Sequence, residues 1–290
     1  MDECYSTRSQ GVGGDSINVK KLHLGLDIGG STTKVVAIEG KQILGTCLVS
    51  ASDPLTAAYG ALGRFLKEQN VPLEAVGSLH ATGVGLSHLG EDLHGIPIQR
   101  IDEFVALARG ARFLSGEKDC LAVSVGTGTA FVSAKGNTAK HIIGSGVGGG
   151  TLLGLSHAIL ETRDWEQIDE LALAGNSSEV DLTIRDLTND EIPGLTSETT
   201  ASNFGRLSDA SRREDLAAAI VTMVYQTVGI IAVTAARAEG LQSIVCTGNG
   251  VLLKSAGLVL KAVSELYNLP LYIPEHTEYA TAIGAALVSY

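Results

Sequence analysis

The stretch "GLDIGGSTTKVV", residues 25–36, places a turn of glycines and hydroxyl side chains between two apolar, β-branched segments. Such segments on either side of a turn predict the two strands of a hairpin. A turn without Cβ atoms lets backbone N–H groups approach an anion, and hydroxyl groups add further donors. The stretch therefore predicts a site that holds a phosphate or a similar anion.

The residues around this turn offer several kinds of group to such a ligand. Lys34 adds a point charge at the end of the turn, and Asp27, at its start, is placed to hold Mg²⁺ through water, because Mg²⁺ keeps much of its hydration shell. The other candidates supply backbone N–H groups and hydroxyls: Gly29, Gly30, Ser31, Thr32 and Thr33. Taken singly, a turn of this kind is also typical of an ordinary hairpin.

Two further glycine-rich loops follow along the chain. The stretch "SVGTGTAF" at 124–131 repeats the chemistry of the first turn with Gly126, Thr127, Gly128 and Thr129. The stretch "GSGVGGGTLLGL" at 144–155 leads into a predicted helix, and a helix N-terminus attracts phosphate groups. Three such loops in one chain favour nucleotide binding over three unrelated turns.

The order of predicted elements is similar in the two halves of the chain. The first half begins with a hairpin over 22–38, a third strand over 43–51 and a helix whose N-cap is Ser52 or Asp53. A strand over 120–125 and a glycine turn begin the second half in the same way. This duplication predicts an α/β fold of two domains that face each other across a cleft. We expect a flexible arm over 1–20 and domains over 21–118 and 119–290.

Two segments of the second half stand apart from this pattern. Residues 175–205 are polar and predict a lid or an insertion. The helix predicted over 215–239 is apolar on nearly all sides, which is typical of a core helix or of a contact between subunits. The sequence leaves both alternatives open for each segment.

Composition and charge limit the classes of partner that the protein is expected to bind. The net charge of −11 and the pI near 5.1 argue against nucleic acid or an anionic membrane as the main partner. The four cysteines include no CxxC pair, so neither a disulfide framework nor a zinc site is indicated, and a reducing cytoplasm fits best. We expect no membrane span, because an apolar run of about 18 residues is not predicted.

The loop motifs together resemble one protein family. In this order, "DIGGSTTK", "VGTGTAF" and "GVGGGTLLGL" are similar to the phosphate and nucleoside loops of the sugar kinase, Hsp70 and actin superfamily, and specifically of the type II pantothenate kinases. The stretches "DLTIRDLT", "TASNFG" and "IVCTGNG" resemble later segments of that family, so that the resemblance runs from about residue 22 to the C-terminus. It implies a duplicated actin-like (ribonuclease H-like) ATPase fold around a nucleotide cleft.

The resemblance also implies a general base. In the family, a glutamate that opens a helix within E-F-x-A-x-x-x-G takes the proton from the primary hydroxyl of pantothenate, and "EFVALARG" at 103–110 supplies Glu103 here. A helix dipole alone stabilises an acid at this position, so ordinary capping explains Glu103 as well. Asp102, the residue before it, is the competing carboxylate.

Further binding residues are implied in the same way. Thr127 is expected to contact the acceptor or the phosphates, and Trp165 falls where bacterial members carry an aromatic residue beside the nucleotide. A partly buried structural role explains Trp165 equally well. The remaining expected nucleotide contacts are Gly128, Gly148, Gly149, Gly150, Thr151, Gly248 and Asn249.

One position departs from the family pattern. Where the family has an arginine that binds the pantothenate carboxylate, this chain has His141, with Lys140 beside it. Neither side chain can form the bidentate clamp of an arginine. The acceptor is therefore either pantothenate held through Lys140 or His141, or a related molecule without the carboxylate, such as pantetheine.

The function implied by the resemblance is transfer of a phosphoryl group from ATP, with Mg²⁺, to the primary hydroxyl of pantothenate, the first step of coenzyme A biosynthesis, by a cytoplasmic homodimer. One alternative is an ATPase that activates an iron–sulfur 2-hydroxyacyl-CoA dehydratase, which would need cysteines to ligate a cluster. Others are a pantetheine or other small-molecule kinase of this fold and a non-catalytic nucleotide sensor. A sugar kinase is disfavoured, because "ATGVG" at 81–85 lacks the aspartate that serves as base in those enzymes.

Overall fold

A six-stranded mixed sheet forms the first half of the protein. The computed structural model describes residues 22–30, 32–50, 53–190 and 192–287. The strands of the first sheet are β1 (Leu22–Ile28), β2 (Thr32–Glu39), β3 (Gln42–Ser50), β4 (Val76–Thr82), β5 (Asp92–Leu93) and β6 (Ile96–Arg100), in the order β3-β2-β1-β4-β6-β5. Strands β1, β2 and β3 pair antiparallel, and β4 and β6 continue the sheet parallel to β1. The predicted elements include no counterpart of β5 and β6.

A second sheet repeats this arrangement. Its strands are β7 (Cys120–Val125), β8 (Thr129–Lys135), β9 (Thr138–Ser145), β12 (Ile244–Thr247) and β13 (Leu271–Tyr272), in the order β9-β8-β7-β12-β13. Again the first three strands pair antiparallel and the last two continue parallel to the first. The strand order β3-β2-β1-β4-β6 of the first sheet therefore recurs in the second, and the predicted duplication is confirmed.

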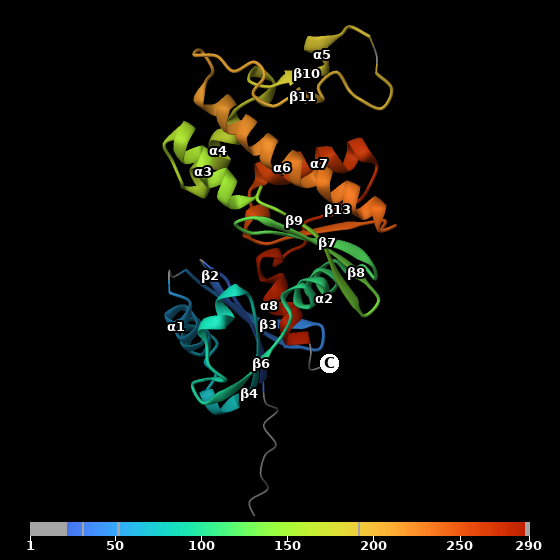
Figure 1. Ribbon diagram of the computed structural model, residues 1–290. Helices are drawn as coiled ribbons and strands as arrows, with labels where there is room; N and C mark the ends of the chain where they lie inside the picture. Colours follow the sequence, from blue (N-terminus) through green and yellow to red (C-terminus); the bar gives the residue numbers. More distant parts are fainter. Residues whose placement is uncertain (1–21, 31, 51–52, 191, 288–290) are drawn as a thin grey trace, which may run out of the picture.

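Helices form the layers outside and between the sheets (Figure 1). Helix α1 (Pro54–Glu68) covers the outer face of the first sheet, and α2 (Glu103–Ser115) and α8 (Ala280–Ala286) lie between the two sheets. The outer face of the second sheet is covered by α3 (Gly149–Leu160), α4 (Trp165–Ala174), α6 (Arg213–Ala238) and α7 (Lys254–Tyr267). Short 3₁₀ turns are η1 (Leu73–Ala75), η2 (Val84–His88), η3 (Ser177–Glu179), η4 (Asn249–Val251) and η5 (Thr277–Tyr279).

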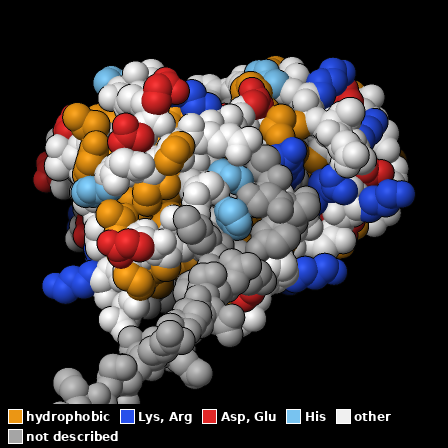
Figure 2. Space-filling model, turned by 90° about the horizontal axis from the view of Figure 1, so that it is seen from below, with side chains coloured by type: hydrophobic (Ala, Val, Ile, Leu, Met, Phe, Trp, Pro, Cys, Tyr) orange, Lys and Arg blue, Asp and Glu red, His pale blue; other side chains and the backbone are white. Residues whose placement is uncertain are grey.

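The first helix begins where the sequence predicts. Asp53 is the N-cap of α1, and its Oδ2 accepts a hydrogen bond from the backbone N–H of Thr56 at 2.7 Å. Pro54 occupies the first turn, where its missing N–H costs nothing. Ser52, the other candidate cap, lies outside the described residues, as does the predicted arm over 1–20. Figure 2 shows the end of the molecule that carries this first half, where acidic, basic and hydrophobic side chains all reach the surface.

Helix α8 packs backbone against backbone between the sheets. A Cβ atom at Gly25 of β1 would lie 1.9 Å from the carbonyl oxygen of Ala282, and one at Gly284 would lie 1.7 Å from that of Ala106 on α2. Only glycine allows such approaches. The C-terminal helix is thereby fixed against β1 and α2, across the division expected at 118/119.

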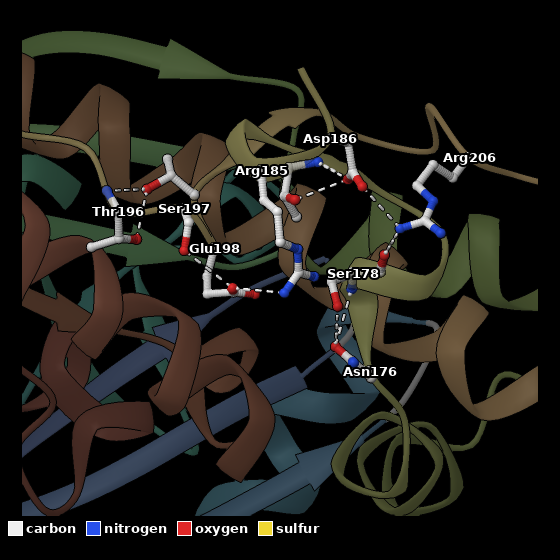
Figure 3. A network of polar contacts seen from close by, with 10 residues as sticks. Asn176, Ser178, Arg185, Asp186, Thr196, Ser197, Glu198 and Arg206 are labelled. Carbon is white, nitrogen blue, oxygen red and sulfur yellow. Dashed lines mark hydrogen bonds and ion pairs between the residues drawn. The ribbon is translucent and has the colours of Figure 1, made fainter. Parts of the chain in front are cut away.

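The polar segment before α6 forms a small insertion on the far side of the second half. It contains β10 (Leu182–Thr183), α5 (Ile184–Leu187) and β11 (Thr200–Ser202), and it lies beyond α4 and α6 from the gap between the sheets (Figure 1). Asp186 accepts hydrogen bonds from Thr183 and pairs with Arg206, while Arg185 pairs with Glu198 (Figure 3). The structure shows an insertion here, one of the two roles predicted for this segment.

The long apolar helix α6 is mostly buried inside the protein. Its side chains, among them Tyr225, Val228 and Ala232, fill the core beneath the second sheet. By length and composition it could also cross a membrane, with a mean hydropathy of 2.0 over 18 residues, a test that core helices pass as well. The expectation that no apolar run reaches that length is therefore wrong for α6, and burial in the core explains the run.

Candidate active site

A cleft of about 980 Å³ lies between the two sheets and takes its lining from both halves. Its size suits a small-molecule site. Of the predicted site residues, the following line it: Asp27, Gly29, Gly30, Thr32, Lys34, Glu103, Thr127, Gly128, Gly149, Gly150, Trp165, Gly248 and Asn249. Thr33, Lys140, His141, Gly148 and Thr151 are not among the lining residues, and Ser31 lies outside the described residues.

The first glycine turn forms one wall of the cleft. The backbone N–H of Gly29 donates to the carbonyl oxygen of Thr32 at 2.9 Å and closes the turn between β1 and β2. Because side chains alternate along a strand, Thr32 and Lys34 face the cleft while Thr33 faces the core. The Thr33 hydroxyl is fully buried and has no hydrogen-bond partner among the described residues.

Asp27 is held by two side chains. It lies opposite Lys34 in the β1–β2 register, and the Lys34 Nζ is 3.5 Å from the Asp27 Oδ2. The hydroxyl of Thr281 on α8 donates to the same Oδ2 at 2.5 Å. Thr281 also lines the cleft, and sequence reasoning missed it because it sits among the alanines of a short apolar helix.

The two neighbouring carboxylates at the start of α2 have different partners. Asp102 is the N-cap, and its Oδ1 accepts hydrogen bonds from the backbone N–H groups of Phe104 and Val105, both at 3.0 Å. Glu103 lines the cleft, and its carboxylate has no hydrogen bond among the described residues. Capping, the structural explanation considered for Glu103, is thus provided by Asp102 instead.

The surroundings of Glu103 disfavour its ionised form. Although the residue as a whole is exposed, partial burial of the carboxyl group raises its pKa, and the nearby charges of Asp27 and Asp102 raise it further. Lys34 acts in the opposite direction and lowers this pKa. A carboxyl group with a raised pKa in a cleft is well matched to general acid–base chemistry.

The third glycine loop packs directly on the second. The backbone N–H of Gly149 donates to the carbonyl oxygen of Gly126, and that of Gly150 to the carbonyl oxygen of Thr127, both at 2.9 Å. The backbone N–H of Gly148, the N-cap residue of α3, donates to the Thr151 hydroxyl at 3.3 Å. These glycines therefore bring α3 against the second turn, and their N–H groups already have partners within the protein.

The end of β12 closes the cleft on the side of the second sheet. Gly248 has a φ of +95°, and a Cβ atom there would lie 2.6 Å from the carbonyl oxygen of Val125. The Oδ1 of Asn249 is buried and has no partner among the described residues. Trp165 and Leu153 add apolar surface to the same lining. An unpaired buried acceptor on a residue that lines a cleft is a group that a donor of a bound ligand could satisfy.

The two candidates for binding an acceptor carboxylate face opposite sides of the second sheet. The Nζ of Lys140 pairs with the Glu239 carboxylate at 2.9 Å, on the side covered by α6. The ring of His141 stacks on that of Phe104, with ring centres 4.5 Å apart, on the side covered by α2. His141 is therefore near the helix end that carries Glu103, and Lys140 is not.

The described residues offer few groups for cysteine chemistry or for a protein-ligated metal ion. Cys47, Cys120 and Cys246 are free and buried, and burial raises the pKa of the Cys120 and Cys246 thiols to about 12. Cys4 lies outside the described residues. No group of three His, Cys, Asp or Glu side chains that could hold a metal ion is found among the described residues. A carboxylate such as Asp27 still fits Mg²⁺, which takes one or two protein carboxylates and completes its shell with water and phosphate oxygens.

The second half of the chain is matched by a known family. A model of the Fumble family matches residues 118–288. The chain belongs to the Fumble family. This Fumble-family chain is 27% identical over 278 residues to the type II pantothenate kinase of Staphylococcus aureus strain USA300. The alignment covers 91% of this chain and 98% of that protein. The resemblance read from the loop motifs is confirmed, and the family and this relative indicate a kinase.

Solved structures show the same fold in other proteins. Component A of the (R)-2-hydroxyglutaryl-CoA dehydratase of Acidaminococcus fermentans has a TM-score of 0.67 and 20% identity, covering 92% of the Fumble-family chain and 96% of its own. The activator of the 2-hydroxyisocaproyl-CoA dehydratase of Clostridium difficile, solved with bound ADPNP, has a TM-score of 0.64 and 20% identity, covering 92% and 93%. These similarities confirm the duplicated actin-like α/β fold.

Proposed function

We propose that this protein transfers the γ-phosphoryl group of ATP to the primary hydroxyl of pantothenate. The observation that carries the proposal is the Glu103 carboxylate, which does not cap helix α2 and which shares one cleft with Asp27 and Lys34. A base, a cation and a carboxylate suited to a metal ion are the groups that phosphoryl transfer needs. The similarity to the S. aureus type II pantothenate kinase supports the choice of acceptor.

The glycine turns of the two sheets are assigned to the phosphates. Gly29, Gly30 and Thr32 on the first turn and Thr127 and Gly128 on the second all line the cleft. Ser31 keeps its predicted role in the first turn. Such transfer depends mostly on positioning and neutralisation of charge, so both turns are expected to contribute to the rate.

Asp27 is assigned to Mg²⁺ through water, and Lys34 to the phosphates beside it. When bound, Mg²⁺ supplies positive charge to the β- and γ-phosphate oxygens. Asp27 orients the metal's water shell, and Lys34 neutralises charge from the other side of the turn. The 3.5 Å ion pair holds the two side chains together beside the first glycine turn.

Glu103 is assigned to the acceptor hydroxyl. Its carboxylate accepts the proton of the primary hydroxyl as the oxygen attacks phosphorus, and Asp102 keeps the helix start capped while this happens. The raised pKa brings the base closer to the working pH, which favours proton transfer.

The nucleoside is assigned to the wall formed by the second half. Asn249 offers its unpaired Oδ1 to a donor of the nucleoside, and Trp165 offers a ring face. Gly149, Gly150 and Gly248 keep this wall free of side chains. Thr151 and Gly148 act one step further away, through the hydrogen bond from the Gly148 N–H to the Thr151 hydroxyl at the start of α3.

For the acceptor we retain pantothenate first and pantetheine second. His141 remains the candidate contact, stacked on Phe104 beside Glu103, whereas Lys140 is committed to Glu239. An assay of ATP-dependent phosphorylation with purified protein and each acceptor tests this choice. Turnover of pantothenate supports the proposal, turnover of pantetheine alone supports the alternative acceptor, and turnover of neither contradicts the assignment.

An activating ATPase is the second candidate, because two solved activators of this kind share the fold. The three described cysteines are buried structural thiols, which favours the kinase. Iron analysis of anaerobically purified protein separates the candidates, since a bound iron–sulfur cluster would contradict the kinase proposal.

A cytoplasmic homodimer is part of the same proposal. Because α6 is already largely buried within one chain, a subunit contact would have to use its exposed positions, such as Ile230 with 39% of its surface accessible. Sedimentation at low protein concentration is expected to give the mass of a dimer, and a monomer would contradict this part.

A further inference from the structure

The contact between Thr281 and Asp27 joins the first strand, β1, to the last helix, α8, inside the cleft. Thr281 is 254 residues away from Asp27 in the sequence, and its hydroxyl donates to the buried Asp27 Oδ2 at 2.5 Å. Both residues line the cleft, and each exposes only 9% of its surface. No role has been assigned to this hydroxyl so far.

The position of Thr281 does not depend on this hydrogen bond. Helix α8 is held by close backbone approaches at three glycines: Gly25 meets Ala282, Gly110 meets Ala280 and Gly284 meets Ala106. The carbonyl oxygens concerned would lie 1.7–1.9 Å from a Cβ atom at each glycine. Loss of the hydroxyl alone should therefore leave the helix in place and release only the carboxylate.

The two oxygens of the Asp27 carboxylate have unequal surroundings. Oδ2 accepts the hydroxyl of Thr281 and faces the Lys34 Nζ at 3.5 Å. Oδ1 has no hydrogen bond among the described residues, and a Cβ atom at Gly83 would lie 2.7 Å from it. Because residue 83 has no Cβ atom, the space beside Oδ1 stays open to a ligand. Oδ2, in contrast, already interacts with Thr281 and Lys34.

From this geometry we infer that Thr281 is a positioning residue for Mg²⁺: it fixes Asp27 through Oδ2 and leaves Oδ1 as the acceptor for metal-bound water. This inference rests on the proposed function, because it requires Asp27 to serve a magnesium–nucleotide complex. A carboxylate held by two donors loses little rotational freedom when the metal arrives, and such preorganisation strengthens binding. The hydroxyl therefore acts on the metal through Asp27.

The test compares Thr281→Val, which keeps the shape but removes the hydroxyl, with Thr281→Ser, which keeps the hydroxyl. Thr227→Val is the matched control, because it removes a hydroxyl that donates to the Met223 carbonyl on α6, away from the cleft. Isothermal titration calorimetry measures AMPPNP binding at a series of Mg²⁺ concentrations and without Mg²⁺. Fluorescence of Trp165, the only tryptophan and a cleft residue, provides a second readout.

We expect Thr281→Val to raise the Mg²⁺ concentration for half-maximal binding about five- to tenfold, the effect of weakening one charge-assisted hydrogen bond. Thr281→Ser and Thr227→Val should stay within about twofold of the wild type, and metal-free AMPPNP affinity should not change. The Ser result is the rescue that a role in helix packing would not produce.

Other results overturn the inference. An unchanged Mg²⁺ dependence in a Thr281→Val protein with a normal melting temperature would show that the hydroxyl does not act on the metal. If Thr281→Val and a second variant, Thr281→Ala, weaken metal-free and metal-dependent binding equally, the hydroxyl is only structural. A wild-type protein whose AMPPNP binding does not respond to Mg²⁺ would instead contradict the proposed function, which keeps the two failures apart.

Discussion

Asp102 caps helix α2, and this leaves the carboxylate of the next residue, Glu103, free to line the cleft. The cap uses one oxygen of Asp102 for two backbone N–H groups, each at 3.0 Å. Two adjacent acids at a helix start would otherwise compete for the same donors. This division of roles is the structural basis for assigning the base to Glu103.

Replacing Glu103 by Gln is expected to stabilise the fold at neutral pH. Partial burial, together with Asp27 and Asp102, raises the pKa of this carboxyl group above its unfolded value, so the folded chain binds its proton more tightly than the unfolded chain. The free energy of unfolding therefore falls as the pH rises from the unfolded pKa of this group through its folded pKa. Gln carries no proton to lose, so the variant avoids this fall. Urea unfolding should give nearly equal stabilities near pH 4 and a more stable variant near pH 7. An advantage that is largest at low pH would contradict the assigned environment.

Replacing Gly284 by Ala is expected to disrupt the packing of α8. The new Cβ atom would lie 1.7 Å from the carbonyl oxygen of Ala106, a backbone atom that cannot move without shifting α2. We expect a loss of about 3 kcal/mol or more in the free energy of unfolding. Gly63→Ala on the exposed face of α1 is the control, because nothing lies within 4 Å of its Cβ position. That change should be neutral or stabilise by up to about 1 kcal/mol. Equal effects at the two sites would rule out the tight contact.

Replacing Asn249 by Ala is expected to weaken ATP binding without weakening the fold. Its buried Oδ1 has no partner among the described residues, so its removal costs the free protein no hydrogen bond. The KM for ATP should rise about five- to tenfold, while kcat and the melting temperature change little. Steady-state kinetics and a thermal melt measure both quantities. An unchanged KM would mean that the nucleoside does not use this oxygen.

Local patterns in the sequence predict much of this fold. The turns at 29–34 and 126–129 are short, and their glycines and flanking β-branched residues determine a hairpin with little help from distant contacts. The same strand–glycine turn–strand pattern occurs in both halves of the sequence and predicts the duplicated sheets. Strands β5 and β6 escape prediction because each is short and depends on pairing: β6 pairs with β4, and β5 pairs with β6.

Side-chain direction within the site is harder to predict. The register of β9 shifts between Phe131 and Val132 of its neighbour β8, and such a shift decides which face each residue takes. Lys140 and His141 face different helices because neighbouring residues of a strand point to opposite faces of the sheet. Thr281 carries no local signal at all, because its partner Asp27 is brought to it only by the packing of α8 on β1.

The most direct test of the account compares Glu103→Gln with Asp102→Asn in the ATP-dependent phosphorylation of pantothenate. Asparagine still caps a helix, so Asp102→Asn is the matched control for loss of one carboxylate at this helix start. We expect Glu103→Gln to lower kcat by a factor of about 10² to 10⁴ with little change in the KM for ATP, and Asp102→Asn to retain most of the activity. A fully active Glu103→Gln protein would contradict the central claim.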